Sequence, residues 1–217
     1  MTVDETTLRT PLTRKRIIEA AVELADEQGI EALSMRKLGH SLGVEAMSLY
    51  NHVGGKDDIL DGMVDGLFAE IGVPLPNGGD WKSAVTETAT RAKDVFAAHS
   101  WAVPLITSRE LTGPSAFALM DRTLGVLLDA GYPMDLVHHA WHVISSHVMG
   151  YAFQETSSTW GKDSDHDHAK ADALLREYGE QFPNVAKLVP HLMECSHDEE
   201  FQFGLDIILS GIEARLS

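Results

Sequence analysis

Apolar residues recur every three or four positions along most of the chain, and this spacing predicts helices. The pattern is clearest between Leu60 and Ile71, where apolar residues occupy positions 60, 63, 64, 67, 68 and 71. Short consecutive apolar runs, such as Val103–Ile106, are the only hints of a strand. We therefore expect an all-α protein.

The first 72 residues carry the signals of four helices, with predicted spans 13–29, 34–42, 45–52 and 56–71. Thr13 and Ser34 are N-cap residue types, whereas Gly29 and Gly43 are typical of helix ends. The fourth helix begins at Lys56, with two carboxylates in its first turn. The pattern predicts three short helices followed by a longer connecting helix.

A segment with two prolines and three glycines, residues 72–80, interrupts the helical pattern and is the best candidate for a domain boundary. Further helices are predicted over 81–100, 114–130, 135–153, 169–179 and from 196 through 212. The polar segment 156–168 is predicted to be a loop, and the proline-containing stretch after Gly179 is predicted to be irregular. We expect a first domain over 1–55, a connecting helix over 56–72 and a larger helical domain over 73–217.

Composition narrows the class of protein. The only cysteine is Cys195, which excludes an internal disulfide framework and a cysteine-rich zinc module. No apolar run approaches the roughly 20 residues that cross a bilayer, and the N-terminus shows no secretory signal. These features predict a cytoplasmic protein that does not span a membrane.

Charge is distributed unevenly along the chain. The formal net charge is -16, yet residues 1–56 hold seven basic and eight acidic residues and are nearly neutral. An acidic protein as a whole is a poor partner for nucleic acid. The neutral N-terminal segment nevertheless permits contact with DNA phosphates, while the acidic remainder would repel DNA and help to orient it.

The segment Ser34–His52 has the spacing of a helix-turn-helix, with Gly43 in the turn. In such a motif the second helix enters the major groove. Its outer face is predicted to carry small, polar or aromatic residues suited to base edges: Ala46, Met47, Ser48, Tyr50, Asn51 and His52. Arg36, Lys37 and Lys56 lie at helix starts, from which they are expected to reach backbone phosphates.

The run Gly29–Lys56 resembles the DNA-binding segment of the tetracycline repressor (TetR) family, above all in Leu49-Tyr50, His52-Val53 and Lys56. The closing segment Phe201–Glu213 resembles the final dimerisation helix of the tetracycline-repressor subgroup. The resemblance implies a homodimeric repressor that a small-molecule effector releases from a near-palindromic DNA operator. It also implies DNA contact by Arg36, Ala46, Met47, Ser48, Tyr50, His52 and Lys56.

Several residues of the larger domain are candidates for the lining of an effector pocket between helices. They are Thr88, Phe96, Ile106, Arg109, Thr123, Leu127 and Trp141. Arg109 would suit an acidic effector. Tetracycline-binding members hold a drug-chelated magnesium with histidines, where this chain has Gly72 and Ile106, so the resemblance implies a different effector.

Two apolar stripes are candidates for a dimeric four-helix bundle. They comprise Leu136, Ala140, Val143 and His147, and Phe201, Leu205, Ile208 and Ile212. Burial of both stripes within one protomer is the alternative.

Histidines supply the other candidate chemistry. His138 and His142 are four residues apart on one predicted helix, with His139 and His147 nearby, and this spacing can place two imidazoles on one metal ion. His166 and His168 alternate with Asp165 and Asp167 in the predicted loop, where solvation is the simpler interpretation. A metal-responsive regulator that uses the His138 and His142 region is therefore the alternative hypothesis.

A helical metal-dependent enzyme is a less favoured alternative than the metal-responsive regulator. The chain has no phosphate-binding loop, dinucleotide glycine motif, nucleophile elbow or zinc-protease pattern. We expect no catalytic residues, no bound metal and no cofactor. The preferred hypothesis is a ligand-responsive transcriptional repressor.

Overall fold

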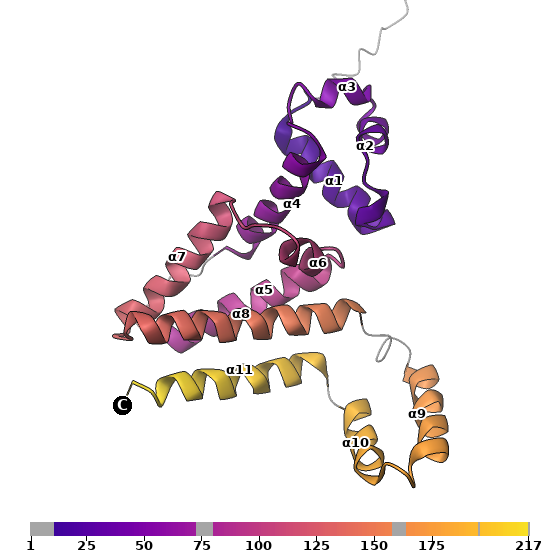
Figure 1. Ribbon diagram of the computed structural model, residues 1–217, viewed down its shortest axis with the longest axis vertical. Coiled ribbons are helices and arrows are strands. Elements are labelled where there is room, and N and C mark those ends of the chain that lie inside the picture. The colour runs from indigo at the N-terminus through magenta and orange to yellow at the C-terminus, as the bar shows by residue number, and fades with distance from the viewer. Residues whose placement is uncertain (1–10, 73–79, 158–163, 195, 217) are drawn as a thin grey trace, which may run out of the picture. The chain divides into compact units, whose positions relative to one another are not determined.

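The computed structural model describes residues 11–72, 80–157, 164–194 and 196–216. Within these ranges every regular element is a helix, as the apolar spacing predicted. The elements are α1 (Arg14–Gln28), the 3-10 turn η1 (Ile30–Ala32), α2 (Met35–Leu42), α3 (Ala46–Leu49), α4 (Lys56–Ile71), α5 (Trp81–Ala98), α6 (Ala102–Thr107), α7 (Pro114–Asp129), α8 (Met134–Ser157), α9 (Ser164–Tyr178), α10 (Pro183–Glu194) and α11 (His197–Glu213) (Figure 1).

The contacts divide the chain into two units. One unit comprises Met1–Glu70 and Trp101–Leu119, and the other comprises Ile71–Ser100 and Met120–Ser217. The first unit therefore includes α6 and the start of α7 as well as α1–α4. Trp101, just before α6, is tied to this unit by a 2.7 Å hydrogen bond from its indole Nε1 to Asp26.

The first unit is built on α1 and α4. Thr13 accepts a hydrogen bond from the Arg16 amide and starts α1, and Gly29 ends it with a positive φ of 81°. The predicted inner faces of both helices are buried, except that Phe68 is only half-buried: Ile17, Ala21, Leu24 and Ala25 on α1, and Leu60, Met63, Val64, Leu67 and Ile71 on α4. Burial of these apolar stripes is the main stabilising contribution in this unit.

The second unit is built on α8, which packs against α5 and α11. Figure 1 shows α11 running alongside α8 for most of its length. Val137, Ile144 and Val148 of α8 are buried, as are Phe201 and Leu205 of α11. The predicted capping box at Ser196 and Glu199 is present at the start of α11.

A buried lysine joins three helices of this unit, α5, α8 and α11. The Lys93 side chain on α5 is only 4% exposed, and its ammonium contacts Asp94 at 3.0 Å, Glu155 of α8 at 3.6 Å and Asp198 of α11. Burial alone would lower the pKa of Lys93, but the hydrogen bonds to Asp198 and Asp94 outweigh it and raise that pKa above its usual value. Lys93 therefore stays charged inside the unit.

Val103–Ile106, the apolar run that hinted at a strand, belongs to helix α6, as the all-α prediction requires; so short an apolar run does not distinguish a strand from a helix. Two predicted elements were wrong. The predicted loop 156–168 contains the end of α8 and the start of α9, with residues 158–163 outside the described part. Ser and Asp suit a first helical turn, so polarity did not exclude a helix.

The stretch after Gly179 was also predicted wrongly, as irregular, and it forms α10. Pro183 occupies the first position of that helix, where its missing N–H costs nothing. Pro190 lies inside the helix.

The two stripes considered for a dimeric bundle are partly buried within one protomer. Ala140, Phe201, Leu205 and Ile212 are all buried, which agrees with the alternative of internal burial. Val143, a member of the α8 stripe, is exposed, and the other exposed large apolar residues of these two helices lie outside the stripes: Met134 and Phe153 on α8, and Phe203 and Ile207 on α11.

Candidate functional site

The turn between α2 and α3 is held by its two glycines. Gly43 takes the left-handed conformation (φ 68°, ψ 32°) that ends α2, and its amide donates to the carbonyls of Gly39 and His40. A Cβ on Gly39 would lie 2.9 Å from the Val44 carbonyl oxygen and 3.1 Å from the Ala46 nitrogen. The absence of a side chain at Gly39 therefore lets α3 approach α2 closely.

Buried apolar side chains fix the angle of this pair. Leu38 of α2 and Leu49 of α3 have no exposed surface, and Val53, four residues beyond the end of α3, is also buried. Ser34 accepts a hydrogen bond from the Lys37 amide at 3.3 Å and caps α2. Two short helices are thus held as one rigid corner, the arrangement of a helix-turn-helix.

One face of α3 carries the side chains predicted to read DNA. Met47 is 75% exposed and Tyr50 is 49% exposed, so both side chains are accessible to a partner. His52 is exposed as well, whereas Ala46 and Ser48 are half-buried. The regular helix is shorter than the predicted 45–52, but hydrogen-bonded turns continue it to His52, whose amide donates to Leu49.

Basic residues flank this face. Arg36, Lys37 and Lys56 are exposed, Arg36 and Lys37 in the first turn of α2 and Lys56 at the first position of α4. The Lys37 ammonium donates to the Gln28 side chain at 3.1 Å, which holds it near the end of α1. All three positions suit contacts with phosphates on either side of a groove.

Asp58 positions the turn between α3 and α4, a role that the sequence did not reveal. Its carboxylate accepts from Arg14 of α1 at 2.7 Å and from the Gly54 amide at 2.8 Å. The Arg14 hydrogen bond, followed by that from Gly54, lowers the pKa of Asp58. The start of α4 is therefore linked to α1 by a charge that is present at neutral pH.

A row of aspartates on α4 binds Arg109, between α6 and α7, and Ser115, in the first turn of α7. Arg109 contacts Asp61 at 2.7 Å and Asp57 at 3.4 Å. Asp65 accepts from the Ser115 amide at 2.7 Å and from its hydroxyl at 3.0 Å. The four-residue spacing of the three aspartates, which is visible in the sequence, places them on one face of α4 but does not identify their partners. We call these five residues the α4 clamp.

The candidate pocket residues have different surroundings. Phe96, Ile106, Thr123 and Leu127 are buried, and Trp141 is half-buried. The hydroxyl of Thr88 is buried too and donates to the Ala84 carbonyl at 2.7 Å. Arg109 already has two carboxylate partners in the α4 clamp. The assignment of these residues to an effector pocket stays a prediction.

The histidines of α8 lie close together on its surface. The ring of His138 lies 4.7 Å from that of His142 and 5.4 Å from that of His139, measured between centroids. In the described ranges, no group of three His, Cys, Asp or Glu side chains is placed to hold a metal ion. The side chains of Asp165 and His166 lie outside the described part; Asp167 is buried and His168 exposed.

None of the helices described here has the length and apolar character needed to cross a bilayer. This includes α8, the longest, with 24 residues.

Both parts of the chain match known family models. Residues 17–63 match the bacterial regulatory proteins of the tetR family, and residues 73–216 match the tetracyclin repressor-like C-terminal domain. An HTH-type transcriptional regulator of Saccharopolyspora erythraea is 38% identical over 167 residues, which cover 77% of this chain and 69% of that protein. The HTH-type transcriptional repressor DrrR1 of Streptomyces coeruleorubidus is 31% identical and covers 95% of this chain and 79% of its own length.

A solved structure shares the fold over nearly the whole chain. The TetR family protein ActR of Streptomyces coelicolor, in complex with actinorhodin, superposes with a TM-score of 0.81 and 31% identity, covering 94% of this chain and 98% of that one. The helix-turn-helix geometry, the two matched domains and these relatives agree. The chain belongs to the TetR family of transcriptional regulators.

Proposed function

We propose that this protein is a homodimeric repressor that binds a near-palindromic DNA operator through α3 and leaves it when a small molecule binds. The observation that carries this proposal is the exposed face of α3, where Met47 and Tyr50 are accessible. The close approach of α3 to α2 that positions this face requires a glycine at position 39. The relatives are named as transcriptional regulators or repressors, which supports a regulatory role over an enzymatic one.

The chemistry of the α3 face fits base recognition. Met47 and Ala46 offer apolar contact to a thymine methyl group, and Ser48, Tyr50 and His52 offer hydrogen bonds. Arg36, Lys37 and Lys56 supply the phosphate contacts that fix the register of the helix, but carry little sequence information themselves.

Exposed apolar residues support a dimer through α8 and α11. Phe203 is 69% exposed and Ile207 is 58% exposed, and they lie four residues apart on one face of α11. Val143 of α8 is exposed as well. Large apolar side chains grouped in this way favour burial against a second copy, which would complete a four-helix bundle.

The α4 clamp offers a route from effector to DNA. Asp57 and Asp61 lie on the helix that begins directly after the α3 turn, and their partner Arg109 precedes α7. An effector that binds better to one conformation of the Arg109 segment would shift the spacing of the two α3 helices in the dimer. A ligand with equal affinity for both conformations would not release the operator.

Actinorhodin is the first effector to test, because ActR, a relative with 31% identity, has been solved in complex with it. The predicted pocket comprises Thr88, Phe96, Ile106, Arg109, Thr123, Leu127 and Trp141. Substitution Trp141→Ala is expected to change the actinorhodin dose response without changing operator affinity.

The test of DNA binding compares two tyrosines that are similarly exposed. Tyr50→Ala is expected to weaken binding to a selected operator duplex about fivefold or more, since a good base contact contributes about 1–3 kcal/mol. Tyr178→Ala, on α9, is the matched control and is expected to bind like the parent protein. Fluorescence anisotropy measures both affinities. Equal affinity of the two variants would contradict the proposed DNA interface.

A further inference from the structure

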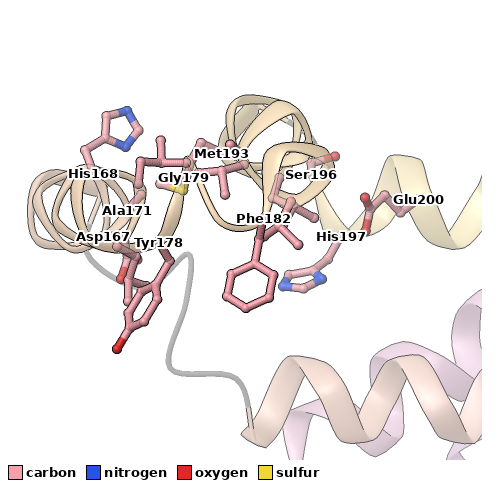
Figure 2. Close-up of a pocket in the computed structure, with 16 residues that line it drawn as sticks. Asp167, His168, Ala171, Tyr178, Gly179, Phe182, Met193, Ser196, His197 and Glu200 are labelled. Atoms are coloured by element: carbon pink, nitrogen blue, oxygen red, sulfur yellow. The ribbon is translucent and has the colours of Figure 1, made fainter.

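A cavity of about 870 Å³ lies among α9, α10 and the start of α11 (Figure 2). Its volume is within the range of about 300–1,000 Å³ that small-molecule sites occupy. None of the residues proposed above for the effector pocket or the DNA interface lines it. The cavity therefore needs its own explanation.

Most of the lining is apolar. Leu174 and Leu175 of α9 and Val189 and Leu192 of α10 face the cavity from two sides. Leu174 and Leu192 remain 40% and 56% exposed, so the two helices do not bury these side chains against each other. An apolar molecule in the cavity would remove this surface from water, which is the usual driving force for binding at such sites.

The charged residues of the lining have one sign. Asp167 of α9 and Glu200 of α11 both line the cavity, and its described lining includes no lysine or arginine. The polar residues beside them are His168, Ser196 and His197. Together with the net charge of -16 for the whole chain, the half-buried carboxylate of Glu200 in an apolar cavity favours a positively charged ligand.

Two aromatic rings point to the same class of ligand independently. Tyr178 ends α9 and Phe182 directly precedes α10, and their centroids are 6.4 Å apart. Figure 2 shows both rings extending from the same side of the α9–α10 pair, with His197 and Glu200 on the α11 side of Phe182. Aromatic faces attract organic cations through their quadrupoles, in addition to offering apolar contact.

We infer that this cavity binds an amphipathic organic cation. The apolar body of the ligand lies between α9 and α10, and its positive charge lies near Glu200 and the two aromatic rings. The site is separate from the predicted effector pocket, and binding there does not depend on operator recognition.

Two ions of nearly identical size and shape test the inference. Isothermal titration calorimetry of the full chain is done with tetraphenylphosphonium and with tetraphenylborate, which differ mainly in the sign of their charge. Saturable binding is expected for the cation, with affinity at least about fivefold above that for the anion. Equal affinities, or the absence of saturable binding of the cation, would overturn the inference.

Matched variants locate the binding. Val189→Trp fills the cavity and is expected to abolish binding of the cation. Leu188→Trp, at the preceding residue of α10 and outside the lining, is expected to leave it unchanged. Glu200→Gln keeps the shape of the side chain but removes its charge. It is expected to weaken binding of the cation about fivefold and to leave binding of the anion no weaker.

Sedimentation velocity measures the oligomeric state and tests whether a second copy of the chain, not a ligand, covers the cavity. If Val189→Trp lowers the oligomeric state while neither ion binds the parent protein, a second copy of the chain covers the cavity and the inference is wrong. Retained cation binding in Val189→Trp would contradict it as well.

Discussion

Substitution of Gly39 by alanine should destabilise the protein, although alanine is the better helix former. The added Cβ would lie 2.9 Å from the Val44 carbonyl oxygen and 3.1 Å and 3.2 Å from the Ala46 nitrogen and Cα. All three atoms belong to the backbone of the turn, so no side chain can move aside. Overpacking of this kind costs about 1–3 kcal/mol, and helix propensity returns about 1 kcal/mol. The expected net effect is a loss of up to about 2 kcal/mol in the free energy of unfolding.

Gly66→Ala is the matched control. Gly66 also lies inside a helix, but a Cβ there would meet no atom within 4 Å. This variant should gain about 0.5–1 kcal/mol from reduced backbone entropy in the unfolded chain.

Thermal unfolding followed by circular dichroism measures the difference. A change of 1 kcal/mol corresponds to about 2–4 °C for a chain of this size, so Gly39→Ala should melt several degrees below Gly66→Ala. Gly39→Ala should also weaken DNA binding, since the turn must shift to accept the methyl group. If Gly39→Ala melts at or above Gly66→Ala, the close approach of α2 and α3 does not constrain the turn as argued.

Three further predictions address charge. Lys93→Met should change the free energy of unfolding by no more than about 1 kcal/mol. The substitution removes the buried ammonium, and the carboxylate partners of Lys93 are 40–79% exposed, so water can hydrate them. A loss of more than about 3 kcal/mol in urea unfolding would refute this prediction. The pKa of Asp58 is lowered by the Arg14 hydrogen bond, so the stability from this contact should be full at neutral pH and disappear as the pH falls below about 4. Asp58→Asn should flatten the acid limb of the stability curve, and an unchanged limb would count against the contact. Arg36→Ala should reduce the slope of log affinity for the operator against log salt concentration by about one. Met47→Ala should lower the affinity and leave this slope unchanged. Equal slopes for the two variants would show that Arg36 makes no phosphate contact.

The elements that the sequence predicted best have strong local signals. The stripe of α4, the N-caps Thr13 and Ser34 and the capping box at Ser196 each depend on residues within one or two turns, and the structure confirms all of them. The family assignment likewise depends on one continuous run, residues 29–56, and the family models confirm it.

The remaining features depend on contacts between distant parts of the chain. Apolar spacing predicted a face for α11, but it could not tell whether Phe201 and Leu205 pack inside one protomer or against another. The pairing of Arg109 with Asp57 and Asp61 joins residues about 50 positions apart, and nothing in the local pattern selects α4 as the partner of the segment before α7. Helix α10 was missed because its two prolines were read as helix breakers, although the first stands at a favourable position.

Selection from a random pool of double-stranded DNA tests the central claim most directly. The purified full chain is incubated with the pool at moderate salt, which screens non-specific phosphate contacts, and the retained DNA is sequenced. We predict enrichment of a two-fold symmetric site with half-sites about one helical turn apart, and its loss with Tyr50→Ala. If folded, dimeric protein enriches no sequence, or if Tyr50→Ala enriches the same site equally well, α3 is not the DNA-reading helix.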